Sequence, residues 1–395
     1  MQAITIVKDV FWTGAINWIF DFYGLSIQRG TTYNAYVVKS GDKAAVIDTS
    51  HPYHYEEFLI RVKSIVNPEK IDYVICNHAE PDHSFALPIL MKEAVNAKVV
   101  ATPKCVEMLR RLYPPADYDY IEVKEGDTLK LGEKTFRFIE APFMHWPEVM
   151  FTYLEEEKIL FPCDGFAAHV APTNLFADKA KDIMDDAARY YAFIFRPFAR
   201  KVLQAIEKVR KLDLKIIAPS HGPIIRENPT EVLDLWEKWS SEDWIGENKV
   251  LVAYNTMWGA DKLMAETIAN SIMEEDIEVN VFDLKTAPMA DVLKECFLSK
   301  AIVLGSLTVF GHPYPHVYAV LPLLKLMRPE GKIGAAFGVS GWMKGASARK
   351  IEEALKELNM DVIEPAIGVI LRPDEEELQK CVELGKEIAK RVKAT

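Results

Sequence analysis

The feature that most constrains the fold is a dense cluster of polar side chains directly after a buried strand. The apolar run Ile71–Cys76 has the length of a strand, and the residues after it are Asn77-His78-Ala79-Glu80-Pro81-Asp82-His83. Four potential metal ligands therefore lie within six residues. Because Pro81 is disfavoured inside a helix, an extended loop would direct His78, Glu80 and Asp82 to one side. Such a loop could serve two adjacent metal ions.

A second interpretation of this segment is purely structural. Asp82 or Ser84 would cap a helix over Phe85–Met91, with the histidines exposed or merely hydrogen-bonded. Repetition of the same design favours the metal site, because three further predicted strands each lead to a candidate ligand. Thr135–Ala141 leads to His145, Lys158–Cys163 leads to Asp164, and Lys215–Ser220 leads to His221.

Together these segments supply more donors than one structural zinc ion uses. Three histidines, one glutamate and two aspartates, with His83 as an optional seventh ligand, exceed the four ligands of such a site. Two metals that share a carboxylate would use them. Asp164 is the best candidate for the shared carboxylate, because it stands alone at a strand end. Mixed imidazole and carboxylate ligation suits non-haem iron.

The length and the pattern of the chain predict two domains. A chain of 395 residues is too long for one typical core, and the polar segment Ser240–Asn248 separates residues 1–247 from residues 248–395. After this segment, strand patterns at 250–254, 278–282, 301–305 and 332–337 alternate with helix patterns, including 262–273 and a long final helix. Such alternation predicts a doubly wound parallel sheet.

Ligands of a doubly wound sheet bind beyond the carboxyl ends of its strands, so the loops after Tyr254, Gly305 and Phe337 form a second candidate site. The first of these loops leads into a helix amino terminus, which favours a phosphate group, and the others offer polar groups and aromatic surface. Three ordinary turns with buried tryptophans are the alternative. The candidate contacts are Thr256, Met257, Trp258, Gly259, Ala260, Leu307, Thr308, Val309, Phe310, Ser340, Gly341 and Trp342.

Charge and cysteine usage exclude several classes of protein. A net charge of −11, from 58 acidic and 47 basic residues, argues against a nucleic-acid binder. No segment has the apolar length of a signal peptide or a membrane helix, which predicts a cytoplasmic protein without a membrane partner. The five cysteines form no Cys-x-x-Cys pair, which argues against disulfides and against an iron–sulfur or rubredoxin-type centre. Electrons would therefore arrive from another molecule.

On these motifs the chain resembles the metallo-β-lactamase superfamily, and more closely its flavodiiron branch, the A-type flavoproteins. Hydrolases of the superfamily usually carry a second histidine at the position of Glu80. The resemblance implies an α/β fold in which an N-terminal metallo-β-lactamase-like αβ/βα sandwich is followed by a flavodoxin-like, FMN-binding domain. One iron would be held by His78, Glu80, His145 and Asp164. The other iron would be held by Asp82, His221 and the shared Asp164, and the role of His83 is left open.

The resemblance also implies an activity and partners. Family members reduce dioxygen to water, nitric oxide to nitrous oxide, or both, with FMN passing electrons to a di-iron site. An external donor, rubredoxin or a reduced deazaflavin coenzyme, supplies the electrons. The protein would be a head-to-tail homodimer or a dimer of dimers. Trp146 and His169 would line the pocket or hydrogen-bond to ligands, whereas no ligand position is matched by His51, His54, His312 or His316.

The chain departs from the family pattern at the predicted flavin site. Ala260 and Asp261 stand where asparagine and threonine are common, and Leu307 stands where proline is common. A carboxylate at Asp261 would repel the FMN phosphate unless it were turned outward or offset by Lys262.

Two other functions compete with a flavodiiron oxidoreductase. They are a zinc-dependent hydrolase of the same superfamily, and an FMN electron carrier with a vestigial metal site. Glu80 and the flavodoxin-like half argue against the hydrolase, and the complete ligand set argues against the carrier.

Overall fold

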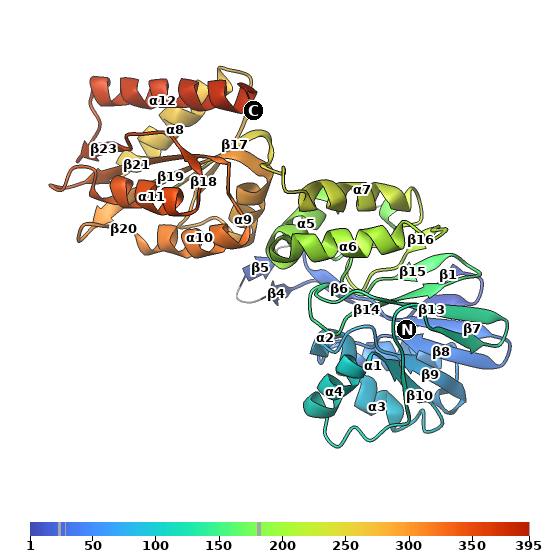
Figure 1. Ribbon diagram of the computed structural model, residues 1–395. Coiled ribbons are helices and arrows are strands. Elements are labelled where there is room, and N and C mark those ends of the chain that lie inside the picture. The colour runs from blue at the N-terminus through green and yellow to red at the C-terminus, as the bar shows by residue number, and fades with distance from the viewer. Residues whose placement is uncertain (23–24, 28, 180–182, 395) are drawn as a thin grey trace. The chain divides into compact units, whose positions relative to one another are not determined.

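The computed structural model describes residues 1–22, 25–27, 29–179 and 183–394 (Figure 1). The chain forms two compact units, Met1–Ser241 and Glu242–Thr395. The division between these units lies within the polar segment Ser240–Asn248. Among the described residues, no helix is long and apolar enough to cross a lipid bilayer.

The first unit contains two sheets that share an apolar core. The seven-stranded sheet has the order β1-β2-β7-β8-β9-β10-β11, and the five-stranded sheet has the order β12-β13-β14-β15-β16. Their strands are β1 (Ile4–Val7), β2 (Val10–Trp12), β7 (Tyr36–Ser40), β8 (Lys43–Ile47), β9 (Ile71–Ile75), β10 (Lys98–Ala101), β11 (Tyr120–Glu122), β12 (Thr128–Leu131), β13 (Lys134–Glu140), β14 (Met150–Leu154), β15 (Ile159–Phe161) and β16 (Ile216–Ile217). Val38 and Ile75 of the first sheet pack with Phe136 and Phe161 of the second in this core. Two short pairs complete the strands, β3 (Ala15–Asn17) with β6 (Thr31–Tyr33), and β4 (Phe20–Phe22) with β5 (Leu25–Ile27).

Helices cover the outer faces of the two sheets, as Figure 1 shows. The seven-stranded sheet is covered by α1 (Tyr55–Lys63), α3 (Leu87–Met91) and α4 (Pro103–Leu112). Phe58, Leu90 and Leu109 of these helices pack against Val46 and Val74 of the strands. The opposite layer is formed by α5 (Ile183–Tyr190), α6 (Ala199–Val209) and α7 (Pro229–Ser240). The result is the predicted αβ/βα sandwich.

The second unit is built on one parallel sheet with the strand order β18-β17-β19-β21-β22, in which β23 also pairs with β21 and β20 with β19. This is the flavodoxin-like order, in which the second strand lies outside the first. The strands are β17 (Glu247–Asn255), β18 (Glu278–Asp283), β19 (Ser299–Val309), β20 (His312–Pro313), β21 (Ile333–Ser340), β22 (Asp361–Val362) and β23 (Ile367–Ile370). The predicted doubly wound sheet is therefore confirmed.

Apolar residues on both faces of this sheet are covered by helices, which explains the nearly continuous apolar runs of its strands. One face is covered by α8 (Ala260–Met273) and α12 (Glu375–Ala394), with Ile268 and Ile388 in the core. The other face is covered by α9 (Met289–Leu298), α10 (Pro315–Leu326) and α11 (Ala346–Glu357).

Parallel pairing brings the predicted cofactor loops to one edge of the sheet. Tyr254 lies opposite Gly305, and Gly305 lies opposite Phe337. Two strands are longer than predicted, since β19 continues to Val309 and β21 continues to Ser340. Residues 307–309 and 340 were expected in loops but lie at strand ends. Their backbone groups stay paired with neighbouring strands beyond the apolar residues that marked each strand in the sequence.

Candidate metal centre and cofactor loops

Each candidate metal ligand follows a strand of the first unit, at the positions that the sequence predicts. His78 and Glu80 follow β9, His145 follows β13, Asp164 follows β15 and His221 follows β16. Asp82 and His83 belong to a short helix, α2 (Pro81–Ser84). The expectation of an extended loop through Asp82 is therefore wrong. Pro81 is the first residue of this helix, where the missing N–H leaves no hydrogen bond unmade.

The helix-cap interpretation of this segment is also wrong. No side chain caps α2 or α3, and the Ser84 hydroxyl donates to the carbonyl oxygen of Ala79 at 2.6 Å instead. His78 and His83 are 0% and 1% exposed, so both imidazoles are inside the protein.

A first group of ligands surrounds one oxygen of Asp164. The Nε2 atoms of His78 and His145 each lie 3.2 Å from Glu80 Oε2. The same two nitrogens lie 3.5 Å and 3.4 Å from Asp164 Oδ2. Two imidazoles and two carboxylates thus converge on one point.

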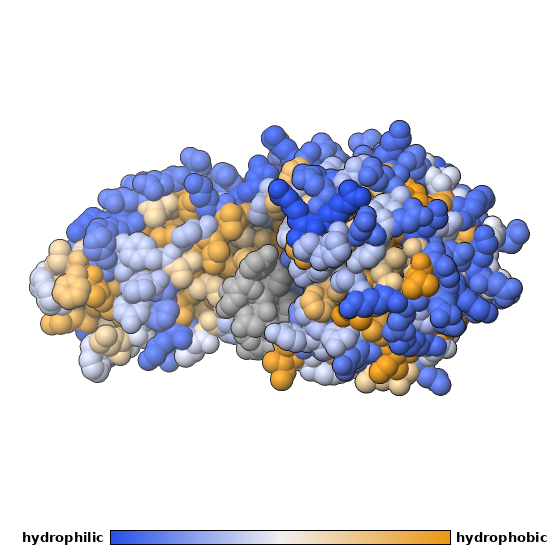
Figure 2. Space-filling view, turned by 90° about the horizontal axis from the view of Figure 1, so that it is seen from below, coloured by the Kyte–Doolittle hydropathy of each residue, from blue (hydrophilic) through white to orange (hydrophobic). Residues whose placement is uncertain are grey.

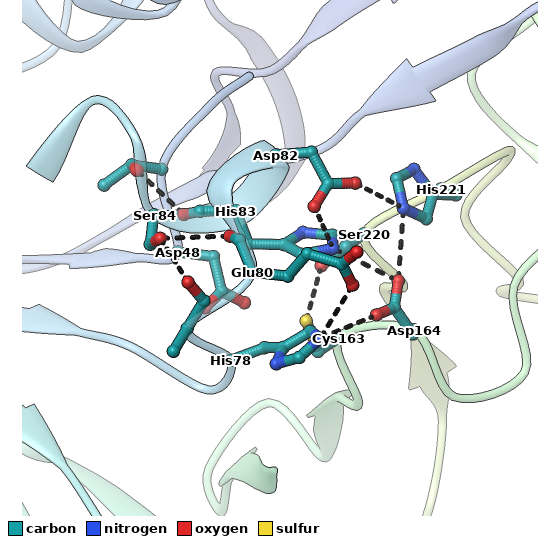
Figure 3. Close-up of polar contacts among 12 residues, drawn as sticks. Asp48, His78, Glu80, Asp82, His83, Ser84, Cys163, Asp164, Ser220 and His221 are labelled. Carbon is teal, nitrogen blue, oxygen red and sulfur yellow. Dashed lines mark hydrogen bonds and ion pairs between the residues drawn. The ribbon is translucent and has the colours of Figure 1, made fainter. Parts of the chain in front are cut away.

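A second group surrounds the other oxygen of the same carboxylate. His221 Nε2 lies 3.1 Å from Asp164 Oδ1 and 3.4 Å from Asp82 Oδ2. His83 Nε2 lies 3.3 Å from Asp164 Oδ1 and 3.3 Å from Asp82 Oδ1, so this imidazole also faces the group. Figure 3 shows Asp164 between His221 and His78. One oxygen toward each group is the arrangement that a carboxylate shared by two metals requires.

The donor atoms fit metal ions better than they fit one another. Both oxygens of Asp164, Asp82 Oδ1 and His83 Nε2 are buried and have no hydrogen-bond partner among the described residues. Buried polar atoms in this condition are costly unless an ion or a proton compensates them. Cys163 lies next to Asp164 and is close enough to His83 and Asp164 to share a metal ion with them. Burial raises the pKa of its thiol well above the usual range, which disfavours the thiolate form that binds metals.

The charges of the site favour cations. Although burial opposes it, close contact with the carboxylates of Asp164 and Glu80 raises the pKa of His145 to about 9, and close contact with those of Asp164 and Asp82 raises the pKa of His221 to about 10. Against the same opposition from burial, the neighbouring histidines hold the pKa of Asp164 well below its usual range. Metal ions would displace the imidazole protons, so metal binding should release protons.

The structure adds two carboxylates that the sequence analysis missed. Glu148 Oε1 lies 2.7 Å from His78 Nδ1, and both side chains are fully buried. Asp48 follows β8 and accepts the backbone N–H and the side-chain amide of Asn77 at 2.8 and 3.0 Å. Asp48 repeats the pattern of an apolar strand followed by a carboxylate, so the sequence contained a pattern that could have identified it. Glu148 carries only a weak signal, a charged residue directly before the apolar stretch Val149–Leu154.

Three aromatic side chains flank the ligands. Trp146 packs edge-on against His78, with ring centroids 5.1 Å apart, and His169 lies 4.7 Å from His221. Thr31 Oγ1 is 2.9 Å from His169 Nδ1, so this ring is held beside the second ligand group. Tyr190, which the sequence analysis did not single out, lies 4.6 Å from His169. Burial raises the pKa of Tyr190 well above its usual range, so its phenol keeps its proton beside Asp164.

The predicted flavin loops carry exposed aromatic side chains and glycines whose backbone is not covered by other atoms. Trp258, Phe310 and Trp342 are 90%, 93% and 83% exposed, which contradicts the alternative of buried tryptophans. Figure 2 shows apolar residues gathered at the end of the second unit where the loops after β19 and β21 lie. A Cβ atom built on Gly259 or Gly341 would meet nothing within 4 Å, which leaves backbone room for a ligand. A flat ring system and a phosphate group fit this edge.

Two predicted hydroxyl contacts are engaged within the protein. Thr308 Oγ1 donates to Ser347 Oγ at 2.8 Å, and Ser340 is buried with its hydroxyl 3.4 Å from the carbonyl oxygen of Val369. Thr256 Oγ1 accepts the N–H of Gly259 at 3.0 Å and shapes the loop before α8.

Asp261 turns inward, so neither of the two conditions that would relieve repulsion of the phosphate, an outward side chain or a charge offset by Lys262, is met. The side chain is 3% exposed, and its Oδ1 accepts the N–H of Val339 at 3.1 Å. Lys262 instead lies 3.6 Å from Glu266 on its own helix. Burial raises the pKa of the Asp261 carboxyl to about 7. The carboxyl therefore ties the first cofactor loop to the end of β21.

The comparisons with known proteins agree with this division of the chain. Residues 31–222 match the model of the ODP family beta lactamases, and residues 252–385 match the flavodoxin model. The chain is 39% identical to a nitric oxide reductase of Moorella thermoacetica over 99% of both chains.

Solved structures match over the whole chain as well. The flavodiiron protein of Giardia intestinalis has a TM-score of 0.95 at 29% identity and covers 100% of this chain and 97% of its own. The rubredoxin:oxygen oxidoreductase of the anaerobe Desulfovibrio gigas has a TM-score of 0.93 at 30% identity, with 100% and 99% coverage. Fold and site define a class of oxidoreductase in which a β-lactamase-type metal domain is joined to a flavodoxin domain. Within this class, the chain belongs to the flavodiiron protein family.

Proposed function

We propose that this protein reduces dioxygen to water, nitric oxide to nitrous oxide, or both, at a di-iron site supplied with electrons by FMN. The domain over residues 1–247 would hold the irons and the domain over residues 248–395 the flavin. Names of the relatives support both gases, since one is a nitric oxide reductase and another an oxygen oxidoreductase. The observation that carries the proposal is the position of Asp164, which directs one oxygen to each of two ligand groups.

The geometry supports one set of residues for each iron. His78, Glu80, His145 and Asp164 would hold one iron, and Asp82, His83, His221 and Asp164 the other. The irons would supply Lewis acidity and one electron each, and reduced FMN two more, which meets the four-electron demand of dioxygen. Buried carboxylates and imidazoles fix the spacing of the two groups. Tyr190 holds a proton beside Asp164, and Trp146 and His169 pack against the ligand rings.

A zinc hydrolase is the second candidate, and Glu80 argues against it. Its Oε2 points between His78 and His145, so a hard anionic oxygen occupies a ligand position there. Anionic oxygen beside imidazole suits iron. The flavodoxin domain, which a hydrolase does not need, argues in the same direction.

The deciding experiment is anaerobic single-turnover mixing of fully reduced, metal-analysed protein with dioxygen and, separately, with nitric oxide. Flavin absorbance is followed while peroxide and nitrous oxide are quantified. We expect iron in the metal analysis and flavin reoxidation without release of peroxide. Zinc in the metal analysis, or peroxide released at a rate unaffected by removal of the metal, would overturn the proposal in favour of the hydrolase or the electron carrier.

For the donor, the names of two relatives support two candidates, rubredoxin for the Desulfovibrio gigas protein and coenzyme F420H2 for an oxidase of Methanothermobacter marburgensis. We propose that rubredoxin, or a reduced deazaflavin coenzyme, reduces the flavin, and that the protein is a head-to-tail homodimer or a dimer of dimers. The two donors are compared by their rates of flavin reduction under anaerobic conditions, and the assembly by light scattering. A fully active monomer would contradict the proposed assembly.

FMN is proposed to bind at the edge formed by the loops after β17, β19 and β21, with its phosphate at the N-terminus of α8. The contacts would come from 256–260, 307–310 and 340–342. The exposed rings of Trp258, Phe310 and Trp342 offer stacking surface for the flavin, and the open Gly259 lets the backbone approach the phosphate.

A charge on Asp261 should make FMN binding depend on pH. The carboxyl is largely neutral below its pKa of about 7 and charged above it, so repulsion of the phosphate grows as pH rises. We expect the FMN dissociation constant of the native chain to increase between pH 6 and pH 8.5. The variant Asp261→Asn should bind FMN about tenfold more tightly at pH 8 and about equally at pH 6. Quenching of flavin fluorescence on titration of the flavin-free protein measures both constants.

The matched control for this prediction is Asp276→Asn, because Asp276 is exposed just beyond the other end of α8. This variant should follow the native pH profile. A tightening by Asp261→Asn that is the same at pH 6 and pH 8, or weaker FMN binding at both, would contradict a role for the charge.

A further inference from the structure

A buried carboxylate lies behind one of the metal ligands and contacts it directly. Glu148 Oε1 is 2.7 Å from His78 Nδ1, and the side chains of both residues are 0% exposed. The same oxygen accepts the backbone N–H of Ala79 at 3.1 Å. Glu148 therefore holds both the imidazole and the backbone of the loop that carries His78.

This contact decides which nitrogen of His78 carries the proton. A carboxylate only accepts hydrogen bonds, so when a metal ion takes the place of the proton on Nε2, the remaining proton of the imidazole resides on Nδ1. The lone pair is then on Nε2, the atom that lies 3.2 Å from Glu80 Oε2 and 3.5 Å from Asp164 Oδ2. The negative charge behind the ring also makes Nε2 a stronger donor to a metal.

The position of Glu148 links two ligand loops. It lies three residues after His145, in the loop between β13 and β14, and Thr102 Oγ1 donates to its backbone carbonyl oxygen at 2.9 Å. This loop thus contributes the candidate ligand His145, and through Glu148 it orients a second candidate ligand, His78, which follows β9. Both of these ligands belong to the group around Asp164 Oδ2.

One oxygen of Glu148, Oε2, is buried without a hydrogen-bond partner among the described residues. An unpaired buried oxygen is unfavourable for folding, so burial by itself does not favour a carboxylate at this position. The carboxylate is accounted for by the contacts of its other oxygen with His78 and with the N–H of Ala79.

We propose that Glu148 is a positioning residue of the metal centre, which fixes His78 as the Nδ1–H tautomer and thereby tightens the metal held by His78, Glu80 and His145. The proposal rests on the proposed function only in that His78 ligates a metal. It concerns one of the two metal positions, because, among the described residues, no carboxylate faces the Nδ1 atom of His221. The Nδ1 of that ring faces the backbone carbonyl oxygen of Thr32 at 2.6 Å.

The variant Glu148→Gln tests this inference, because it keeps the shape of the side chain and removes the charge. We expect one of the two irons to be released to a ferrous chelator about 10- to 100-fold faster than in the native protein, while the other is released at the native rate. In the Mössbauer spectrum of protein loaded with ⁵⁷Fe, one of the two iron signals should change. Glu148→Asp should restore part of the slow release.

A control separates positioning from folding. Glu140→Gln alters a carboxylate at the end of β13, before the same loop, and should leave both release rates unchanged. The far-UV circular dichroism of metal-free Glu148→Gln should match that of the native metal-free protein, which shows that the variant folds. Unchanged release of both irons, equal acceleration of both, or acceleration matched by Glu140→Gln would overturn the inference. If the native protein holds zinc, the proposed function fails, and the same release measurement with zinc still tests Glu148.

Discussion

Replacement of Asp164 by alanine should remove iron from both positions and abolish gas consumption. The carboxylate contributes one oxygen to each ligand group, so its loss takes a ligand from both metals at once. It also removes a negative charge that the surrounding imidazoles share. Metal-ion catalysis of this type is worth several kcal/mol, so the rate of dioxygen or nitric oxide consumption should fall by about a thousandfold or more. Iron per chain and gas consumption are measured on the same preparation.

The control for this variant is Asp185→Ala. Asp185 lies on α5 in the same unit, is about half exposed and forms an ion pair with Arg189 on the helix surface. Iron content and activity should stay near native values. Flavin content should be native in both variants, because Asp164 and the flavin loops belong to different compact units. An Asp164→Ala protein that retains both irons and native turnover would exclude the bridging role.

Replacement of Lys332 by methionine should strongly destabilise the flavodoxin unit. Lys332 is 0% exposed, and its ammonium group donates to the carbonyl oxygens of Ile245, Phe297 and Ser299 at 2.8, 2.8 and 2.7 Å. Methionine keeps the apolar stem but leaves these carbonyl groups without their donor. Each unsatisfied buried group is worth about 1–3 kcal/mol, so the free energy of unfolding should fall by roughly 3–5 kcal/mol. Urea unfolding followed by the release of flavin fluorescence reports on this unit.

Lys325→Met is the matched control, because Lys325 is exposed in the last turn of α10. Its effect on the free energy of unfolding should stay within about 0.5 kcal/mol. If Lys332→Met changes the free energy by less than about 1 kcal/mol, water or a relaxed backbone must satisfy the carbonyl groups, and the buried ammonium is not required.

The ligand set could be located from the sequence because its signals are local. Each of Asp164, His145 and His221 follows an apolar run that forms a strand, and Glu80 stands two residues from His78. The ligands follow strands of both sheets, and these strand ends meet at one edge of the sandwich, so the local pattern was enough to predict that the side chains come together. Periodicity likewise gave the αβ/βα sandwich and the flavodoxin-like sheet, because burial of one or both faces leaves a pattern in every strand.

Contacts that depend on side-chain direction were not predictable in this way. The inward turn of Asp261 depends on an N–H group of β21, far along the chain. Glu148 and His78 are seventy positions apart, and neither segment contains a pattern that predicts their hydrogen bond. The extension of β19 to Val309 was not predicted, because the end of a strand depends on hydrogen bonds to neighbouring strands more than on the residue types at that end.

The sequence by itself determined the two folds, their order and the identity of the candidate metal-ligand residues, since strand periodicity and the placement of His, Glu and Asp at strand ends are properties of short segments. Only the tertiary structure decided which oxygen of Asp164 faces which ligand group, that His83 points into the second group, and that Glu148 stands behind His78. These features are distances between atoms of separate loops. They are set by how the two sheets pack on one core. That packing depends on contacts among residues from many parts of the first unit.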